Sequence, residues 1–218
     1  MTFPLDPATV LPEVSADSSL RIQEAVPVHG LTAVTELSPL LQVAQVRDRA
    51  SLQGFLEAYR SAVLVPLEWT AILQAYGYAL RQETRELISL DVELAREPLL
   101  RQFTESSCRV GQRQLSRLRA LRDVRLVQRY LAAIEKGEAR GWHTLAYGVW
   151  LSVFALPLRQ GLVHYAEHTL GGFIEGAARP LALSEADCEQ LQRFACSSLP
   201  RLLEPVLETS GQGGLRLT

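Results

Sequence analysis

Apolar residues recur along most of the chain at spacings of three and four positions, the period of one face of an α-helix. In residues 50–63, the stripe consists of Leu52, Phe55, Leu56, Tyr59 and Val63. Similar stripes occupy residues 69–80, 86–94, 99–118, 124–134, 142–154, 159–178 and 187–203. No stretch alternates apolar and polar residues over a convincing length. The pattern therefore predicts an all-α fold, a single compact domain of about eight to ten helices.

Prolines and capping residues predict where these helices begin and end. Ser184 precedes an acidic first turn and is expected to cap the last long helix. The prolines that fall near stripe boundaries are Pro66, Pro98, Pro157, Pro180 and Pro205. Proline-rich and glycine-rich ends predict a flexible arm over 1–18, a helical domain over 19–208 and a flexible tail over 209–218.

Composition and charge narrow the class of protein. The chain of 218 residues is 47% hydrophobic and 21% charged, which is close to the globular average. A formal net charge of -2 offers no basic field for a phosphate backbone, so no nucleic-acid partner is predicted. The most apolar segment, residues 145–158, is shorter than a membrane span, so we expect a buried core helix and no membrane partner.

The cysteines and the N-terminal sequence indicate a cytoplasmic protein. Cys108, Cys188 and Cys196 form neither an even disulfide set nor a CxxC pair, which fits a reducing compartment. Cys188 and Cys196 lie about two helical turns apart, too far to chelate one ion, and are expected to act as buried small hydrophobes. The N-terminus has no basic region followed by a long apolar run, so no signal peptide is predicted.

One motif raises the possibility of a metal site. The sequence HYAEH places His164 and His168 on one face of a predicted helix, with Glu167 beside them. A third ligand is missing, because His143 opens a different predicted helix. The alternative is that the two histidines border an apolar packing stripe, and the sequence favours this interpretation. The chain also lacks a P-loop, a dinucleotide fingerprint, HExxH and GxSxG, so neither an enzyme nor a cofactor is predicted.

Two further segments allow more than one interpretation. The arginine-rich run over 113–129 is typical either of a site for an anionic partner or of a solvated helix face, and nearby acids favour the solvated face. Gly171, Gly172 and Gly176 weaken the helix that contains HYAEH. They indicate close helix approach or a kink, either in the core or at a subunit interface.

The order of several sequence blocks resembles the UreF family of urease accessory proteins. The resemblance covers roughly residues 19–203. The blocks are VRDRASLQGFLEAY (46–59), ESSCRVGQRQL (105–115), HTLAYG (143–148), LPLRQGLVHYAEHTLGGFIEGAAR (156–179) and LALSEADCEQLQ (181–192).

The resemblance implies an all-α, often dimeric protein without catalysis of its own. Family members act as scaffolds between the urease apoprotein, the accessory protein UreD (also called UreH) and the GTPase UreG, and help couple GTP hydrolysis to nickel delivery. The residues that match family motifs, and are expected to serve packing or partner binding, are Pro27, Gly111, His143, Gly148, Arg179 and Gln190.

The chain departs from the family pattern mainly in its early motif. His29, Val34, Glu36 and Ser38 replace two glycines, a serine and a glutamate of that motif, and we expect these changes to affect partner binding rather than the core. Ser184 and Glu185 stand where a glycine and a glutamine are expected, and the arginine-rich, aromatic C-terminus is missing.

Three functions remain open at this point. The first is a urease accessory scaffold. The second is a UreF-like fold that serves another complex. The third is an enzyme or direct metal carrier that uses His164, Glu167 and His168, with or without a cysteine. The block order favours the first.

Overall fold

The computed structural model of the protein describes residues 31–211, which form helices joined by short loops and contain no strand, so the predicted all-α class is confirmed. The α-helices are α2 (Leu31–Leu40), α3 (Arg49–Tyr59), α4 (Thr70–Leu80), α5 (Thr84–Leu94), α6 (Thr104–Arg117), α7 (Arg125–Glu135), α8 (His143–Val153), α9 (Leu158–Ala178), α10 (Glu185–Cys196) and α11 (Leu199–Gly211). The segment η1 (Arg60–Trp69) is a π-helix, and η2 (Arg101–Phe103) and η3 (Leu118–Ala120) are 3₁₀-helices.

The first two predicted stripes belong to one uninterrupted helical segment rather than to two helices. The chain remains helical from α3 through η1 into α4, and Pro66 lies inside η1. The boundary predicted at Pro66 is therefore wrong. Pro66 has no N–H for a helical hydrogen bond, and the wider π-helical turn accommodates this loss without ending the helix.

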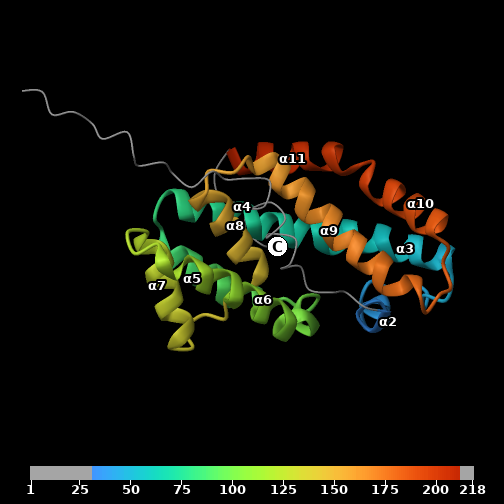
Figure 1. The fold of residues 1–218 in the computed structure, drawn as a ribbon, viewed down its shortest axis with the longest axis horizontal. Helices are drawn as coiled ribbons and strands as arrows, with labels where there is room; N and C mark the ends of the chain where they lie inside the picture. The colour runs from blue at the N-terminus through green and yellow to red at the C-terminus, as the bar shows by residue number, and fades with distance from the viewer. Residues whose placement is uncertain (1–30, 212–218) are drawn as a thin grey trace, which may run out of the picture.

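Helix α8 forms the centre of the molecule. It packs against α4 and α6, and residues 143–149 are all buried. In Figure 1 the α3–η1–α4 segment crosses the middle of the molecule, with α5, α6 and α7 below it and α10 and α11 above it, while α9 crosses the segment in this view. The core helix predicted within 145–158 is thus confirmed as far as Val153, whereas residues 154–157 form a turn in which Phe154 is exposed. Among residues 31–211, none of the helices combines the length and the hydropathy of a bilayer-spanning segment.

The last predicted stripe is divided between two helices. α10 begins after the Ser184 cap, as predicted, and ends at Cys196, and α11 begins at Leu199. Pro205 lies inside α11, so the helix boundary predicted there is also wrong. α11 continues to Gly211, three residues into the predicted tail. The remaining tail residues and the predicted arm over 1–18 lie outside the described residues, and those domain boundaries stay predictions.

The small-residue stretch of α9 faces another helix of the same chain. α9 packs against α10, and the Nε2 of Gln192 donates a hydrogen bond to the carbonyl of Glu167 at 3.2 Å. A Cβ at Gly171 would lie 3.3 Å from the Oε1 of Gln192. Gly171 therefore lies where α9 packs against α10, and a larger side chain there would displace the flexible end of Gln192.

Candidate functional site

His143 lies in an aromatic cluster between α8 and α9. Its ring stacks on Tyr165 with a centroid separation of 5.5 Å, and Tyr147 lies 5.3 Å from Tyr165. The backbone N–H of His143 donates to the Oγ of Ser107 at 3.1 Å. The sequence spacing did not indicate that His143 approaches HYAEH, but the fold stacks its ring on Tyr165, the tyrosine of that motif.

Gly111 and Gly148 permit two close backbone contacts around α8. A Cβ at Gly111 would lie 2.1 Å from the carbonyl oxygen of Gly141, in the loop before α8. A Cβ at Gly148 would lie 2.5 Å from the carbonyl oxygen of Ile72 in α4. Both distances are shorter than any side chain tolerates. These two family-motif residues therefore allow α6 and α4 to pack against α8.

Gln190 and Arg179 lie elsewhere, near the other end of the molecule. Gln190 accepts a hydrogen bond from Nη2 of Arg49 at 2.6 Å, which connects α10 to α3. Arg49 also approaches Asp187 at 3.5 Å. Arg179 follows α9 and is exposed. Pro27 lies outside the described residues, so its predicted role is not tested.

The early-motif departures do not all face solvent. Val34 is fully buried and Ser38 is 2% exposed, and the hydroxyl of Ser38 donates to the carbonyl of Val34 at 2.7 Å. Only Glu36 is exposed among the described departures, and His29 lies outside the described residues. The expectation that these positions face partners is therefore wrong for Val34 and Ser38, which are accommodated in the packing of α2.

The two histidines of HYAEH lie side by side at the edge of the core. Their ring centroids are 4.7 Å apart, and both side chains are half-buried. Burial, and then the neighbouring His164, lower the pKa of His168, which favours the neutral ring. Residues 31–211 contain no group of three or more His, Cys, Asp or Glu that could hold a metal ion.

The cysteines pack as small apolar side chains. All three are free thiols, and Cys188 and Cys196 are partly buried against the core. Burial raises the pKa of Cys108 to about 12 and that of Cys196 to about 11. Since the thiolate is the reactive form, neither residue has the environment of a nucleophile.

A buried carboxyl group that the sequence did not reveal lies next to the aromatic cluster of His143, Tyr147 and Tyr165. Glu68, in η1, is 6% exposed, and its Oε1 accepts a hydrogen bond from the Tyr165 hydroxyl at 3.2 Å. Burial raises the pKa of Glu68 to about 7. Burial, and then Glu68, raise the pKa of Tyr59 well above its ordinary value. The hydrogen bond between Tyr165 and Glu68 connects α9 to η1 inside the core.

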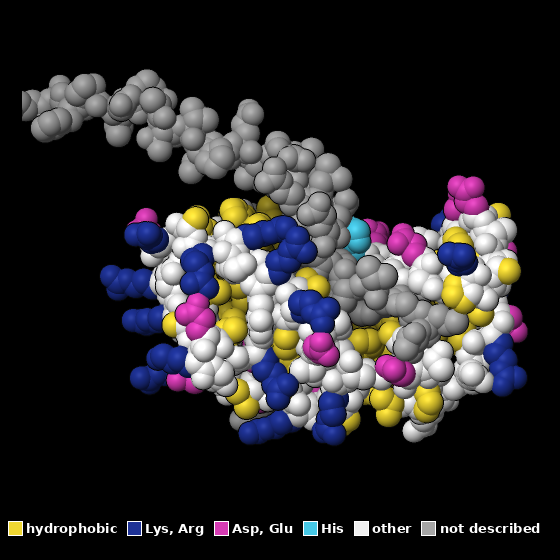
Figure 2. Space-filling view, turned by 60° about the horizontal axis from the view of Figure 1, so that its bottom comes forward, with side chains coloured by type: hydrophobic (Ala, Val, Ile, Leu, Met, Phe, Trp, Pro, Cys, Tyr) yellow, Lys and Arg dark blue, Asp and Glu magenta, His cyan; other side chains and the backbone are white. Residues whose placement is uncertain are grey.

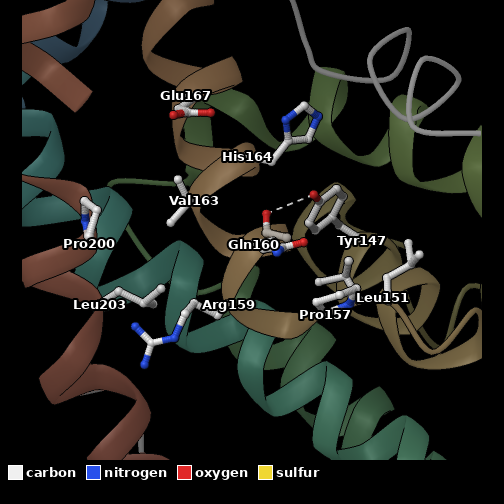
Figure 3. Close-up of a pocket in the computed structure, with 12 residues that line it drawn as sticks. Tyr147, Leu151, Pro157, Arg159, Gln160, Val163, His164, Glu167, Pro200 and Leu203 are labelled. Atoms are coloured by element: carbon white, nitrogen blue, oxygen red, sulfur yellow. Dashed lines mark hydrogen bonds between the residues drawn. The ribbon is translucent and has the colours of Figure 1, made fainter. Parts of the chain in front are cut away.

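A pocket of about 550 Å³ opens between α8, α9 and α11. Figure 3 shows Tyr147 and Leu151 on one side and Pro200 and Leu203 on the other. The Tyr147 hydroxyl donates to the carbonyl of Gly161 at 3.0 Å.

Charged and polar side chains also line this pocket. His164 and Glu167 both lie along it, so the HYAEH helix contributes directly to the wall. Arg159 is bound by both carboxylate oxygens of Glu204, which connects the start of α9 to α11. The pocket therefore combines apolar side chains with the charged and polar groups of Arg159, His164 and Glu167.

Comparison with known proteins supports the family resemblance. The sequence model of the UreF family matches residues 46–194. The chain is 19% identical over 170 residues to the urease accessory protein UreF of Actinobacillus pleuropneumoniae serotype 5b (strain L20), covering 78% of this chain and 75% of that protein. It is 18% identical, over the same shares, to the protein of the same name from serotype 3 (strain JL03).

The matched segment extends from α3 to most of α10 and leaves out α2 and α11. It includes every family-motif residue named from the sequence except Pro27. Since the match extends over more than half of the chain, the protein belongs to the UreF family.

Proposed function

We propose that this chain is a non-catalytic scaffold in urease maturation. In this role it meets a UreD-like (UreH-like) accessory protein, a UreG-like GTPase and the urease apoprotein, and it helps couple GTP hydrolysis to nickel insertion. Nickel is then the cargo of the assembly rather than a resident cofactor of this chain. The observation that carries the proposal is the family match over residues 46–194, supported by relatives named urease accessory proteins.

The packing around α8 supports the same proposal. Gly111, His143 and Gly148 match family motifs, and each lies at a contact that sets how α4, α6 or α9 meets α8. A scaffold needs a rigid arrangement of surfaces more than it needs a reactive group. We also propose a cytoplasmic location and a homodimer, since symmetric dimers are the commonest closed assembly.

A tagged pull-down from the soluble lysate of the source cell tests this function. Mass spectrometry should identify urease subunits together with UreD-like and UreG-like proteins. Failure to recover any of them would contradict the proposal. Light scattering during size-exclusion chromatography tests the dimer, and a monomer at micromolar concentration would contradict that part.

The early-motif departures favour one alternative, a UreF-type fold that serves another complex. Val34 and Ser38 lie on the buried side of α2. Glu36 lies on its exposed side, where it places a carboxylate instead of the family's glycine. Recovery of an unrelated complex in the pull-down, with urease proteins absent from it, would support this alternative.

A further inference from the structure

One face of the protein carries an excess of positive charge. Residues 109–129 contain seven arginines and a single acid, Asp123, which gives this segment a net charge of +6 in a chain whose total is -2. All seven side chains are exposed. We call this surface the α6–α7 basic face, and its residues are Arg109, Arg113, Arg117, Arg119, Arg122, Arg125 and Arg129.

The fold gathers these arginines rather than spreading them around the molecule. α6, η3 and α7 contact one another, and the Nε2 of Gln128 in α7 donates to the carbonyls of Arg119 and Leu121. Figure 2 shows dark-blue Lys and Arg side chains concentrated on the left half of that view, where α5, α6 and α7 lie, with few carboxylates among them. The basic residues therefore form a local surface.

Within residues 31–211, four of the seven arginines have no ion pair. These four are Arg113, Arg122, Arg125 and Arg129. Arg109 pairs with Glu105 and Arg119 pairs with Glu135, in both cases at 2.6 Å. The run is solvated, as the sequence favoured, but the acids of the described residues pair with only part of it.

The spacing of the arginines also disfavours the isolated helices. Arg109, Arg113 and Arg117 repeat every four residues along α6, and Arg125 and Arg129 do so along α7. Like charges at this spacing lie next to each other on a helix and repel. Such an arrangement costs stability in the free protein and is expected where a partner of opposite charge compensates it.

The chemistry of the face favours carboxylates on a protein over a nucleic acid. Guanidinium groups form paired hydrogen bonds with carboxylates, which suits a surface rich in Asp and Glu. Residues 109–129 contain no aromatic side chain on which an unpaired base would stack. The rest of the chain carries a net charge of -8 and would repel an extended polyanion that reached beyond the face.

We infer that the α6–α7 basic face is a docking surface for a partner protein that presents an acidic patch. This inference rests on the proposed scaffold function for the kind of assembly involved, and it adds the surface and the charge of the partner. Contacts between exposed charges chiefly accelerate association and depend on salt. Binding through the face should therefore weaken as ionic strength rises.

A pair of matched charge-reversal variants tests the inference. The test variant is Arg113→Glu/Arg129→Glu. The control is Arg193→Glu/Arg201→Glu, which changes the net charge of the protein by the same amount but at positions on α10 and α11. All four side chains are exposed, so both variants should fold, and circular dichroism checks this. Each protein recovered in the pull-down is purified and titrated against the full-length chain and both variants at low and at physiological salt.

The expected result is that one recovered protein binds the test variant about tenfold or more weakly at low salt, while the control binds as the wild type does. Equal effects of the two variants would overturn the inference. Two further probes test other occupants: a mixed-sequence single-stranded oligonucleotide and vesicles containing phosphatidylserine. Arginine-dependent binding to either probe, or arginine-dependent self-association in light scattering, without an effect on any recovered protein would also overturn it.

The two proposals fail in different ways. If urease proteins are recovered but bind the test variant normally, the docking surface is wrong and the scaffold function stands. If the arginine-dependent partner is unrelated to urease, the docking surface stands and the urease function is wrong. If the chain recovers no protein, both are contradicted.

Discussion

Glu68 shows how far a single residue can depart from what its neighbours in sequence indicate. It lies between Leu67 and Trp69, and an acidic residue inside a helix ordinarily faces solvent. The structure instead buries it against Tyr165, 97 positions further along the chain. No periodicity reveals such a contact, because it depends on how η1 and α9 meet. Gly111 and Gly148 were identifiable from family motifs, but the carbonyl groups that require them were not.

Because Glu68 is buried, the stability of the protein should depend on pH. Its pKa rises from an ordinary 4.5 to about 7. Between these values the folded state holds a proton that the unfolded state has released, so the free energy of unfolding falls as pH rises from about 4.5 to 7 and then levels. The free energy of unfolding falls by about 3 kcal/mol over this range. Glu68→Gln keeps a neutral side chain at every pH, and urea unfolding of this variant should lack that part of the slope. Identical slopes in the two proteins would contradict the assignment.

Adding a single methyl group at Gly148 should strongly reduce the stability of the protein. In Gly148→Ala the new Cβ would meet the carbonyl oxygen of Ile72, a backbone atom that cannot move without shifting α4. We expect a loss of about 1–3 kcal/mol in the free energy of unfolding. Gly54→Ala is the control, because a Cβ at that position meets nothing within 4 Å, and it should stabilise α3 by up to about 1 kcal/mol. Equal effects in chemical denaturation would show that α4 and α8 do not approach this closely.

At the scale of elements, the apolar stripes predicted most helices but not all their boundaries. Pro66 suggested a boundary because α-helical geometry excludes an interior proline, yet a π-helical turn accommodates it. α2 was not predicted: its apolar positions form only a short stripe, and Pro39 lies within it. The region over 99–118 contains a central α-helix with a 3₁₀ turn at each end, a difference in hydrogen bonding that apolar spacing does not encode.

The connection between α7 and α8 depends on one buried carboxylate. Asp91 in α5 accepts the Tyr130 hydroxyl at 2.5 Å and the backbone N–H groups of Arg140 and Gly141 at 2.6 and 2.8 Å. Asp91→Ala leaves these buried donors without an acceptor and should cost about 3 kcal/mol or more. Glu93→Ala, at an exposed position of the same helix, is the control and should cost under about 1 kcal/mol. Hydrogen exchange should show faster exchange at Arg140 and Gly141 in the first variant only, and unchanged exchange there would contradict this role.

At the scale of the whole molecule, the family-motif residues divide between two regions. Gly111, His143 and Gly148 fix the packing around α8, whereas Arg179 and Gln190 lie around α10. The sequence could predict the fold class and the family, because both depend on patterns spread along the chain. It could not predict the pocket between α8, α9 and α11 or the gathering of arginines on α6 and α7. Those surfaces exist only once distant segments are brought together.

The most direct test of the central claim is urease activity in the source cell with and without this protein. We expect deletion of the chain to leave urease largely inactive and poor in nickel, and expression of the wild-type chain to restore both activity and metal content. Normal urease activity and nickel content in the deleted strain would contradict the accessory function, and would mean that a UreF-type fold serves a different assembly.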